Sequence, residues 1–407
     1  MSDLFRRNVF CLLGLPFDAV RMDQAIDRVH DAMTRRSPCV LSTPNLNFVI
    51  GGLSDPAFRD SVINSHLSIV DGMPLVWIAR LLGIPLSERV AGSDLFERLR
   101  ADCTRQVSVY FFGGEDGVAE TAAKRLNADK QGIECAGYES PGFGAVGEIG
   151  NAKSIARINA SGADFLAVSL GARKGQAWIE RHREDIAVPV ICHLGAVVNF
   201  VAGKVNRAPA WMRRAGLEWL WRIKEEPGLW RRYANDGAAL LSLLATRIVP
   251  LAWHLRTHRP ARSEIERAAA KSFVSRHRTR VRLSGAWTAS NLDAVRDLFA
   301  QALATGKDVA VDMRGVSSVD CAFVGLAMLL SGEMRRRGLD CVFAGTNKSV
   351  RRVFELSCAD FLIERDTGRS PARLPASREP AWALTSKGAR RAAANDDLGF
   401  APTVGVI

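Results

Sequence analysis

The first half of the chain alternates short apolar runs with segments whose apolar residues recur at helical spacing. Ala25, Ile26, Val29 and Met33, for example, recur every three or four positions, which predicts a helix over 22–35. Strands are predicted at Val9–Leu15, Cys39–Ser42, Leu67–Val70, Val107–Phe112, Phe165–Leu170 and Val188–His193. Strands that alternate with helices in this way are typical of an α/β fold with a parallel sheet covered on both faces.

The same alternation resumes near residue 276 on a smaller scale. Strands are predicted at Thr279–Leu283, Asp308–Met313 and Cys341–Ala344, and helices at Asn291–Ala304, Asp320–Arg336 and Ser349–Leu356. This predicts a small independent α/β domain. The charged segment 262–280 before it is interpreted as a linker that becomes helical. The segment 369–407 is rich in Arg, Ala and Pro without a period, and we expect it to be disordered.

Between the two units, Ala238–Leu255 is apolar except for Arg247 and His254, and Pro250 interrupts it. We expect no membrane-spanning helix, because an uninterrupted run of about 20 apolar residues is absent. The stretch suits a helix at a membrane interface, since basic residues flank it on both sides. The alternative is a core helix at a domain boundary.

Length and charge narrow the interpretation. A chain of 407 residues exceeds the size at which single cores stop growing, so two domains are expected. The net charge of +12 favours an anionic partner, which would be an acidic lipid, a phosphorylated substrate or nucleic acid. Nucleic acid is the weakest of these because it rests on charge alone. The eight cysteines contain no C-x-x-C pair, which indicates reduced cysteines of a cytoplasmic protein and no zinc site.

The segment Gly195–Tyr233 holds four of the nine tryptophans, interleaved with basic residues. Guanidinium groups bind phosphate oxygens through a planar fork of donors, and indole rings favour the boundary between water and an apolar phase. The segment therefore suits a site where a phosphate-bearing molecule meets a membrane surface. The alternative is an amphipathic core helix whose arginines are solvated.

Polar residues follow the predicted strands at the sheet edge where open α/β proteins bind ligands. The residues expected to gather there are Thr43, Asn45, Asp71, Arg89, Gly113 and Lys174. Asp71 precedes Gly72 at a strand end, so it is a candidate general base, although an N-cap role is an alternative. Gly113 begins the turn of a strand–turn–helix unit whose helix N-terminus would face an anion, but its glycines match no NAD or ATP fingerprint.

These residues resemble the WecG/TagA/CpsF family of glycosyltransferases over about residues 9–233. The resemblance rests on these motifs: Thr43-x-Asn45, Asp71-Gly72, Arg89-Val90-Ala91-Gly92-Ser93-Asp94, Phe112-Gly113-Gly114, Pro141-Gly142-Phe143, Gly171-x-x-Lys174, Trp178, Ala202-Gly203, Arg207-Ala208-Pro209, Glu218-Trp219-Leu220-Trp221-Arg222 and Glu226-Pro227.

The resemblance implies a Rossmann-like domain over 1–235 and a membrane-contacting appendage and linker over 236–275. It implies an inverting hexosyltransferase that moves a sugar from a UDP-sugar to a polyprenyl-diphosphate-linked acceptor, in exopolysaccharide or cell-envelope polysaccharide synthesis. The protein would lie in the cytoplasm, peripherally on the inner face of the cytoplasmic membrane, and would need no metal or other cofactor.

The resemblance also implies roles for individual residues. Asp71 would be the general base, and Thr43 and Asn45 would hold the donor sugar. Arg89 would neutralise the departing diphosphate together with Arg207, Arg214 and Arg222. Gly113 and Lys174 complete the expected substrate-binding set. Fixed cations suit a diphosphate leaving group when no metal is used.

The chain departs from the family pattern at three places. The family usually reads Gly-x-Pro-Lys-Gln-Glu where this chain has Gly175 and Gln176 at the last two positions. A usual Phe-Asp pair is Val198-Asn199, and a usual arginine is Leu229. The departures at Gly175, Gln176 and Asn199 favour an alternative function, in which a catalytically impaired transferase fold acts as a regulatory or scaffold protein through its second domain, whereas the retained Asp71 favours the transferase.

The second unit, 276–368, resembles a STAS domain. The matching features are Leu283-Ser284-Gly285, Val311-Asp312-Met313, Val319-Asp320-Cys321-Ala322 and Arg337-Gly338. Phospho-regulated members carry a serine or threonine after the aspartate, where this chain has Cys321. The resemblance therefore implies an interaction or nucleotide-sensing module without that switch, with a protein as a candidate partner. A purely structural appendage is the alternative.

Overall fold

A computed structural model describes residues 4–142, 144 and 149–364, with the side chains of Ala210 and Arg214 left out. The segment 369–407, for which disorder was expected, and the motif residue Phe143 lie outside the described residues. The described residues from 4 to 364 form one compact unit by their contacts, so the domain boundaries proposed from the sequence stay a prediction.

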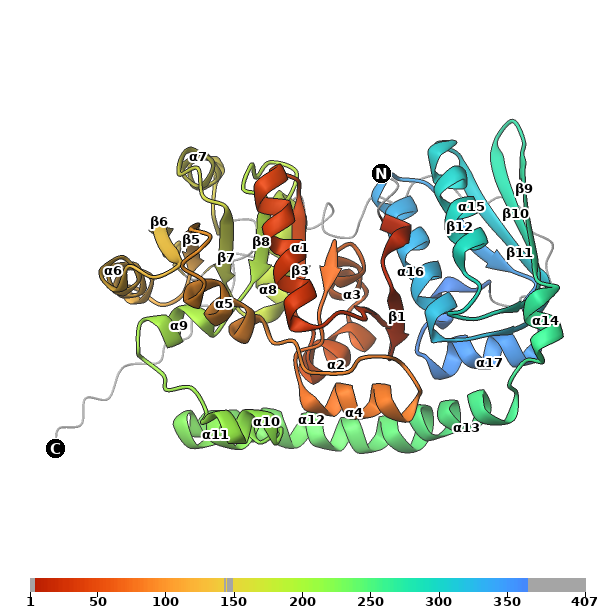
Figure 1. Ribbon diagram of the computed structural model, residues 1–407, viewed down its shortest axis with the longest axis horizontal. Coiled ribbons are helices and arrows are strands. Elements are labelled where there is room, and N and C mark those ends of the chain that lie inside the picture. Colours follow the sequence, from red (N-terminus) through yellow and green to blue (C-terminus); the bar gives the residue numbers. More distant parts are fainter. Residues whose placement is uncertain (1–3, 143, 145–148, 365–407) are drawn as a thin grey trace, which may run out of the picture. The chain divides into compact units, whose positions relative to one another are not determined.

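The larger sheet has six parallel strands in the order β4-β3-β8-β7-β5-β6 (Figure 1). Its strands are β3 (Cys39–Ser42), β4 (Leu67–Ser68), β5 (Val107–Gly113), β6 (Ile133–Glu139), β7 (Phe165–Ser169) and β8 (Val190–His193). The step from β3 to β4 runs toward one edge of the sheet and the step from β5 to β6 toward the other, so the strand order reverses between these two pairs, and β8 and β7 lie between them. Ligands of open α/β sheets bind outside the carboxyl ends of the strands near such a reversal.

Helices cover both faces of this sheet. One face is covered by α1 (Met22–Arg35), α5 (Gly92–Ala101), α6 (Val118–Asp129) and α9 (Val197–Val201), and the other by α7 (Ala152–Ala160) and α8 (Ala172–His182). The helices α2 (Leu46–Ser54), α3 (Pro56–Ile63) and α4 (Met73–Leu81) belong to a third core. Alternate residues of β5 enter different cores, because successive side chains of a strand point to opposite faces. Val109 and Phe111 pack with α1, α5, α6 and α9, whereas Tyr110 and Phe112 pack with α7 and α8.

Two expectations for this sheet were wrong. The run Val9–Leu15 is a hairpin outside the sheet, β1 (Val9–Leu12) and β2 (Leu15–Asp18). Leu13 and Gly14 turn it with φ of 50° and 82°, as a two-residue hairpin turn requires. The sixth strand of the sheet is β6, where no strand was predicted from the sequence. It is an edge strand with alternating burial, so it lacks the continuous apolar run that marked the others.

The second sheet has the order β12-β11-β10-β9. It comprises β9 (Ala269–Val274), β10 (Arg278–Trp287), β11 (Asp308–Val319) and β12 (Cys341–Ala344), with α15 (Asp293–Ala304), α16 (Cys321–Arg336), α17 (Lys348–Leu356) and the short helix η4 (Asp360–Leu362). The elements predicted from 279 to 356 are confirmed. The predicted helical linker is wrong in part, because only α14 (Arg262–Glu266) is helical and β9 pairs antiparallel with β10.

A long helix joins the two sheets. It runs from η2 (Pro227–Leu229) through α12 (Trp230–Leu243) and a π-helical turn (Leu244–Ile248) to α13 (Val249–Thr257). The helix continues through Pro250, so the expected interruption there was wrong. By length and composition it is long and apolar enough to cross a membrane. Proline lacks an N–H and crowds the preceding turn, and the wider π turn before Pro250 accommodates both effects.

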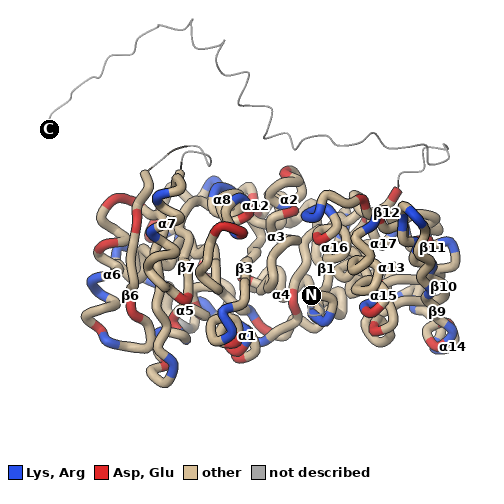
Figure 2. Tube along the Cα trace, turned by 90° about the horizontal axis from the view of Figure 1, so that it is seen from above, with Lys and Arg blue, Asp and Glu red and all other residues tan. Residues whose placement is uncertain are grey.

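Two short helices, α10 (Ala210–Arg214) and α11 (Glu218–Glu225), precede the long helix. They carry much of the basic, tryptophan-rich segment. Figure 2 shows acidic and basic positions interspersed along the described chain, so neither sign of charge is confined to one element there. The charges that line the pocket therefore say more about what it binds than the total charge of the chain does.

Candidate functional site

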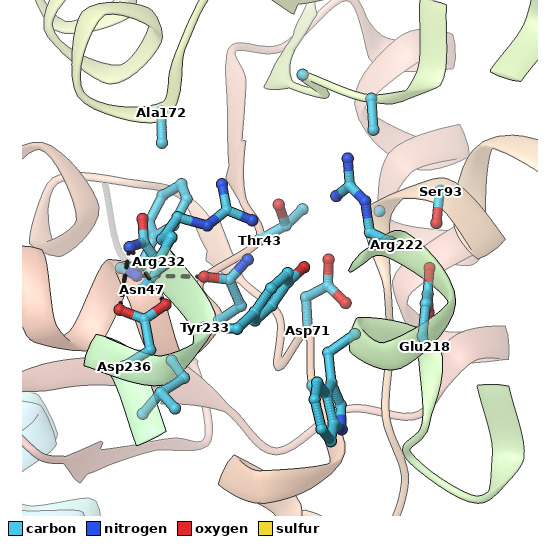
Figure 3. A pocket seen from close by; sticks show the side chains of 18 of the residues that line it. Thr43, Asn47, Asp71, Ser93, Ala172, Glu218, Arg222, Arg232, Tyr233 and Asp236 are labelled. Carbon is cyan, nitrogen blue, oxygen red and sulfur yellow. Dashed lines mark hydrogen bonds between the residues drawn. The ribbon is translucent and has the colours of Figure 1, made fainter. Parts of the chain in front are cut away.

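A pocket of about 610 Å³ lies where the carboxyl ends of β3, β4, β7 and β8 meet α11 and α12. This volume is within the range of small-molecule sites. Figure 3 shows side chains from the sheet edge and from the two helices pointing toward one another across it. Its charged lining residues are Arg89, Arg213, Arg222, Arg232, Asp71, Glu218 and Asp236.

Asp71 follows the short strand β4 and faces the pocket (Figure 3). Its backbone N–H donates to the Pro44 carbonyl at 3.0 Å, which fixes the loop against the end of β3. Burial raises the pKa of Asp71 to about 7, although the Arg89 guanidinium, with Nη1 3.6 Å from Oδ1, opposes the shift. A carboxylate with a pKa near 7 can take a proton from a substrate at neutral pH.

Arg89 lies beside three carboxylates. Its Nη1 donates to Glu218 at 2.9 Å, its Nη2 donates to Asp94, and Asp71 lies 3.6 Å away. Arg89 therefore reaches the pocket, but much of its charge is balanced by protein carboxylates. It links the sheet edge to α11, because Glu218 begins that helix.

Asp94 forms ion pairs with two arginines of the basic segment. Arg207 donates to it at 2.6 Å and Arg213 at 2.5 Å, and these two guanidinium groups and Arg89 hold the pKa of Asp94 below its ordinary value in spite of burial. Arg213 lines the pocket, whereas Arg207 is not among the lining residues. The basic segment is thus anchored to the first turn of α5 through one carboxylate.

Three guanidinium groups near the pocket retain unused donors. The buried Nε atoms of Arg207, Arg213 and Arg222 have no hydrogen-bond partner among the described residues. Buried donors without acceptors are costly, so such atoms call for an explanation. An anionic group of a substrate would provide acceptors for Arg213 and Arg222, which line the pocket. The side chain of Arg214 lies outside the described residues.

Thr43 and Asn45 also line the pocket. Thr43 is buried, and its methyl group lies against Gly92, where an added Cβ would approach Thr43 Cγ2 to 2.8 Å. Asn45 caps α2, because its Oδ1 accepts from the Phe48 backbone N–H at 3.2 Å. The amide NH₂ group is therefore what Asn45 can offer a ligand.

Gly113 and Lys174 are not among the residues that line the pocket. Gly113 has a φ of 103° and packs against β7, where a Cβ would lie 2.7 Å from the Ser169 carbonyl oxygen. Lys174 lies on α8, and its Nζ donates to the Gly144 carbonyl at 3.1 Å. Their positions favour roles in the fold over contact with a ligand in this pocket.

His193 occupies the space that a side chain at position 175 would need. An added Cβ on Gly175 would overlap the His193 ring, and His193 lines the pocket from the end of β8. Burial lowers the pKa of His193, so the neutral ring predominates at pH 7. Its Nε2 lies 2.8 Å from the Leu170 carbonyl, so Nε2 carries the proton and Nδ1 is an acceptor.

The long helix closes the other end of the pocket. Arg232, Tyr233 and Asp236 of α12 point toward it, and Asn47 donates to Asp236 at 3.5 Å (Figure 3). Burial raises the pKa of Asp236. Arg213, Arg232 and Tyr233 belong to the basic segment 195–233 that was expected to meet a phosphate, whereas Asp236 and His193 were not expected from the sequence. Asp236 lies just before the apolar stretch 238–255, in no motif, and His193 lies at the end of a buried strand, where the sequence pattern indicates packing.

Residues 10–252, more than half of the chain, match the model of the glycosyl transferase WecG/TagA/CpsF family. The chain belongs to this glycosyltransferase family. The predicted family and hexosyltransferase class are thereby confirmed.

Two relatives carry the name N-acetylglucosaminyldiphosphoundecaprenol N-acetyl-beta-D-mannosaminyltransferase. The one from Bacillus spizizenii is 31% identical over 196 residues, which cover 47% of this chain and 73% of the relative. The one from Bacillus subtilis is 29% identical over 206 residues, which cover 50% of this chain and 78% of the relative. Residues 274–364 match a model of the STAS domain, which confirms the second predicted resemblance.

Proposed function

We propose that this glycosyltransferase moves a sugar from a UDP-sugar to a polyprenyl-diphosphate-linked acceptor, in the synthesis of an exopolysaccharide or another cell-envelope polysaccharide. The observation that carries the proposal is the placement of Asp71, a carboxyl with a pKa of about 7, in one pocket with Arg213 and Arg222. The pocket thus offers a base for an alcohol and cations for a diphosphate.

In the proposed reaction, the Asp71 carboxylate accepts the proton of an acceptor hydroxyl. The hydroxyl oxygen forms a bond to the anomeric carbon as the bond from that carbon to the diphosphate oxygen breaks, which inverts the anomeric centre. The negative charge of the departing diphosphate is stabilised by the guanidinium groups of Arg213 and Arg222. Arg89 keeps the carboxylate form of Asp71 accessible, because its charge lowers the pKa that burial raises.

The remaining lining residues supply neutral hydrogen-bonding groups. Thr43, Asn45 and Asn47 lie at the sheet edge and suit the hydroxyl or acetamido groups of sugars. The names of the relatives describe a lipid-linked N-acetylglucosaminyl acceptor and the transfer of an N-acetylmannosaminyl group to it. We extend the lipid-linked acceptor class to this chain.

We further propose that the protein lies on the inner face of the cytoplasmic membrane. Large apolar residues are exposed on α4, α10, α11 and the long helix: Trp77, Leu81, Trp211, Trp219, Leu220, Trp230, Leu241, Val249 and Trp253. The long helix also has a packed side, since Asp236, Ile248, Leu251 and Ala252 are buried. A helix with one packed and one exposed apolar side suits a membrane interface better than a crossing.

Vesicle flotation tests the membrane proposal. The wild-type protein should float with vesicles that contain anionic lipid, and Trp230→Ser/Trp253→Ser should float much less, because both indoles are exposed. Trp178→Phe is a control in the buried core. Equal flotation of the wild type and the double variant would contradict the role of this surface.

Transfer itself is tested with a panel of UDP-sugars and a synthetic acceptor in which N-acetylglucosamine is linked to a polyprenyl diphosphate. The wild type should release UDP and extend the acceptor with one donor of the panel, and Asp71→Asn should lower the rate by about 100-fold or more. If Asp71→Asn transfers the sugar as fast as the wild type, Asp71 is not the base. If no donor reacts while the protein is folded, the non-catalytic alternative is favoured.

A further inference from the structure

Helix α16 of the STAS-like domain is buried between its own sheet and the transferase part. Thirteen of its residues are buried, from Cys321 to Met334. A Cβ on Gly325 would lie 2.8 Å from the Val9 carbonyl oxygen, and one on Gly332 would lie 2.5 Å from Ile63 Cγ2. These glycines are about two helical turns apart, so one face of α16 receives β1 and α3 at close range.

Polar contacts surround this apolar interface. Arg296 donates to the Arg7 carbonyl at 2.6 Å, and Arg6 pairs with Asp297 at 2.8 Å. At the other end of α16, Arg335 pairs with Asp60 and Arg336 pairs with Glu184 at 2.7 Å. One hydrophobic core includes residues of both parts, with Phe5 and Phe299 packed edge to face at 6.1 Å.

The STAS-like domain also contacts the long helix beyond the pocket (Figure 1). Arg247 donates to the Glu355 carbonyl at 2.9 Å, and the His254 ring lies 3.2 Å from the Ser349 hydroxyl. Ile248 and Leu251 are buried in the same shared core. The far end of the helix is therefore held by α17, while its near end presents Arg232, Tyr233 and Asp236 to the pocket.

We propose that the STAS-like domain binds the transferase part of its own chain, and that this contact positions the long helix so that α12 completes the pocket. The partner of the α16 face is then the hairpin β1–β2 with α3, and the partner of α17 is the long helix. This inference rests on the proposed function for its effect on catalysis. Its structural claim is that the STAS-like domain orders α12, and this claim can be tested without a measurement of catalysis.

The test uses the full chain with Arg247→Ala/Ser349→Ala, which removes two side-chain contacts between the long helix and α17. The matched control, Arg280→Ala/Ser290→Ala, makes the same chemical changes at exposed positions of the STAS-like domain. Hydrogen exchange of the backbone amides is measured in α12 and, as an internal reference, in α6. Transfer rates and thermal unfolding are measured on the same samples.

Exchange in α12 should become about 3- to 30-fold faster in the double variant, with kcat/KM lower by a similar factor and exchange in α6 unchanged. The control should match the wild type in all three measurements. Unchanged exchange in α12 would overturn the inference. If the wild type transfers no sugar, the proposed function fails, and the exchange measurement still decides whether the STAS-like domain orders α12.

Discussion

At the scale of single residues, the protonation of Asp71 depends on a balance of opposing effects. Burial raises its pKa, Glu218 and Asp94 raise it further, and Arg89 and Arg222 lower it. The result of about 7 leaves both protonation states populated at neutral pH. Small changes in the neighbouring charges should therefore change the pH at which the base becomes available.

Arg89→Gln tests this balance. Removal of the guanidinium group takes away the largest effect that lowers the pKa of Asp71, so the acid limb of the kcat/KM profile should move to higher pH. The profile is measured with the donor and acceptor that the wild type uses. A limb that stays in place would show that Arg89 does not act on the titrating group.

The close packing of Gly175 and His193 gives a second prediction. Gly175→Ala should destabilise the fold by about 1–3 kcal/mol, because the new Cβ overlaps the buried ring. His193→Ala removes that ring, so Gly175→Ala should cost much less in the His193→Ala background. Denaturant unfolding of the four proteins measures this coupling, and equal costs in both backgrounds would contradict it.

The sequence indicated some site residues and not others for physical reasons. Asp71 and Thr43 follow strand ends, and that position alone directs them to the ligand-binding edge of a parallel sheet. Asp236 reaches the pocket only because the long helix folds back over it, which no local pattern shows. Gly113 has the expected turn conformation, but it packs tightly against Ser169, so its role is in the fold and it does not line the pocket.

At the scale of elements, the basic segment places its arginines through α10 and α11. Arg213→Ala/Arg222→Ala should lower kcat/KM for transfer by about 10- to 100-fold, because both guanidinium groups line the pocket and keep unused donors. Arg105→Ala, at an exposed position remote in sequence, is the control. If the double variant performs like the control, the diphosphate does not depend on these arginines.

The long helix shows how an element can differ from its sequence pattern. Pro250 predicts an interruption, yet the π-helical turn at 244–248 keeps the helix continuous. The turn inserts one extra residue, which changes the face that later residues occupy. Trp230 and Leu241 are about three turns apart, and the extra residue brings Val249 and Trp253 near the same side. All four are exposed.

Element type was predictable where burial is complete and less so at edges. The central strands of both sheets have apolar runs, and these were found. The edge strands β6 and β9 are half exposed, so their composition resembles that of a loop or linker. The hairpin β1–β2 is apolar because it lies between the two sheets, which local sequence cannot distinguish from a strand within a sheet.

At the scale of the whole molecule, the shared core predicts cooperative unfolding. The hairpin, the long helix and α16 contribute to one hydrophobic cluster, so the two parts should unfold in a single calorimetric transition. Gly325→Val should lower its midpoint, since the added side chain meets the backbone of β1. Two separate transitions in the wild type would contradict the shared core.

The most direct test of the account is the pH dependence of kcat/KM for the wild type and Asp71→Asn. The wild-type value should rise about tenfold per pH unit below 7 and level off above it, because the carboxylate is the active form. Asp71→Asn should be slow and lack this limb. In the wild type, the raised pKa of Asp71 means that ionisation of the carboxyl in the folded state lowers the stability as the pH rises from about 4 to 7. Asp71→Asn has no such carboxyl, so it should avoid this loss and stay folded at pH 8. A folded Asp71→Asn protein with the wild-type rate and profile would contradict the account.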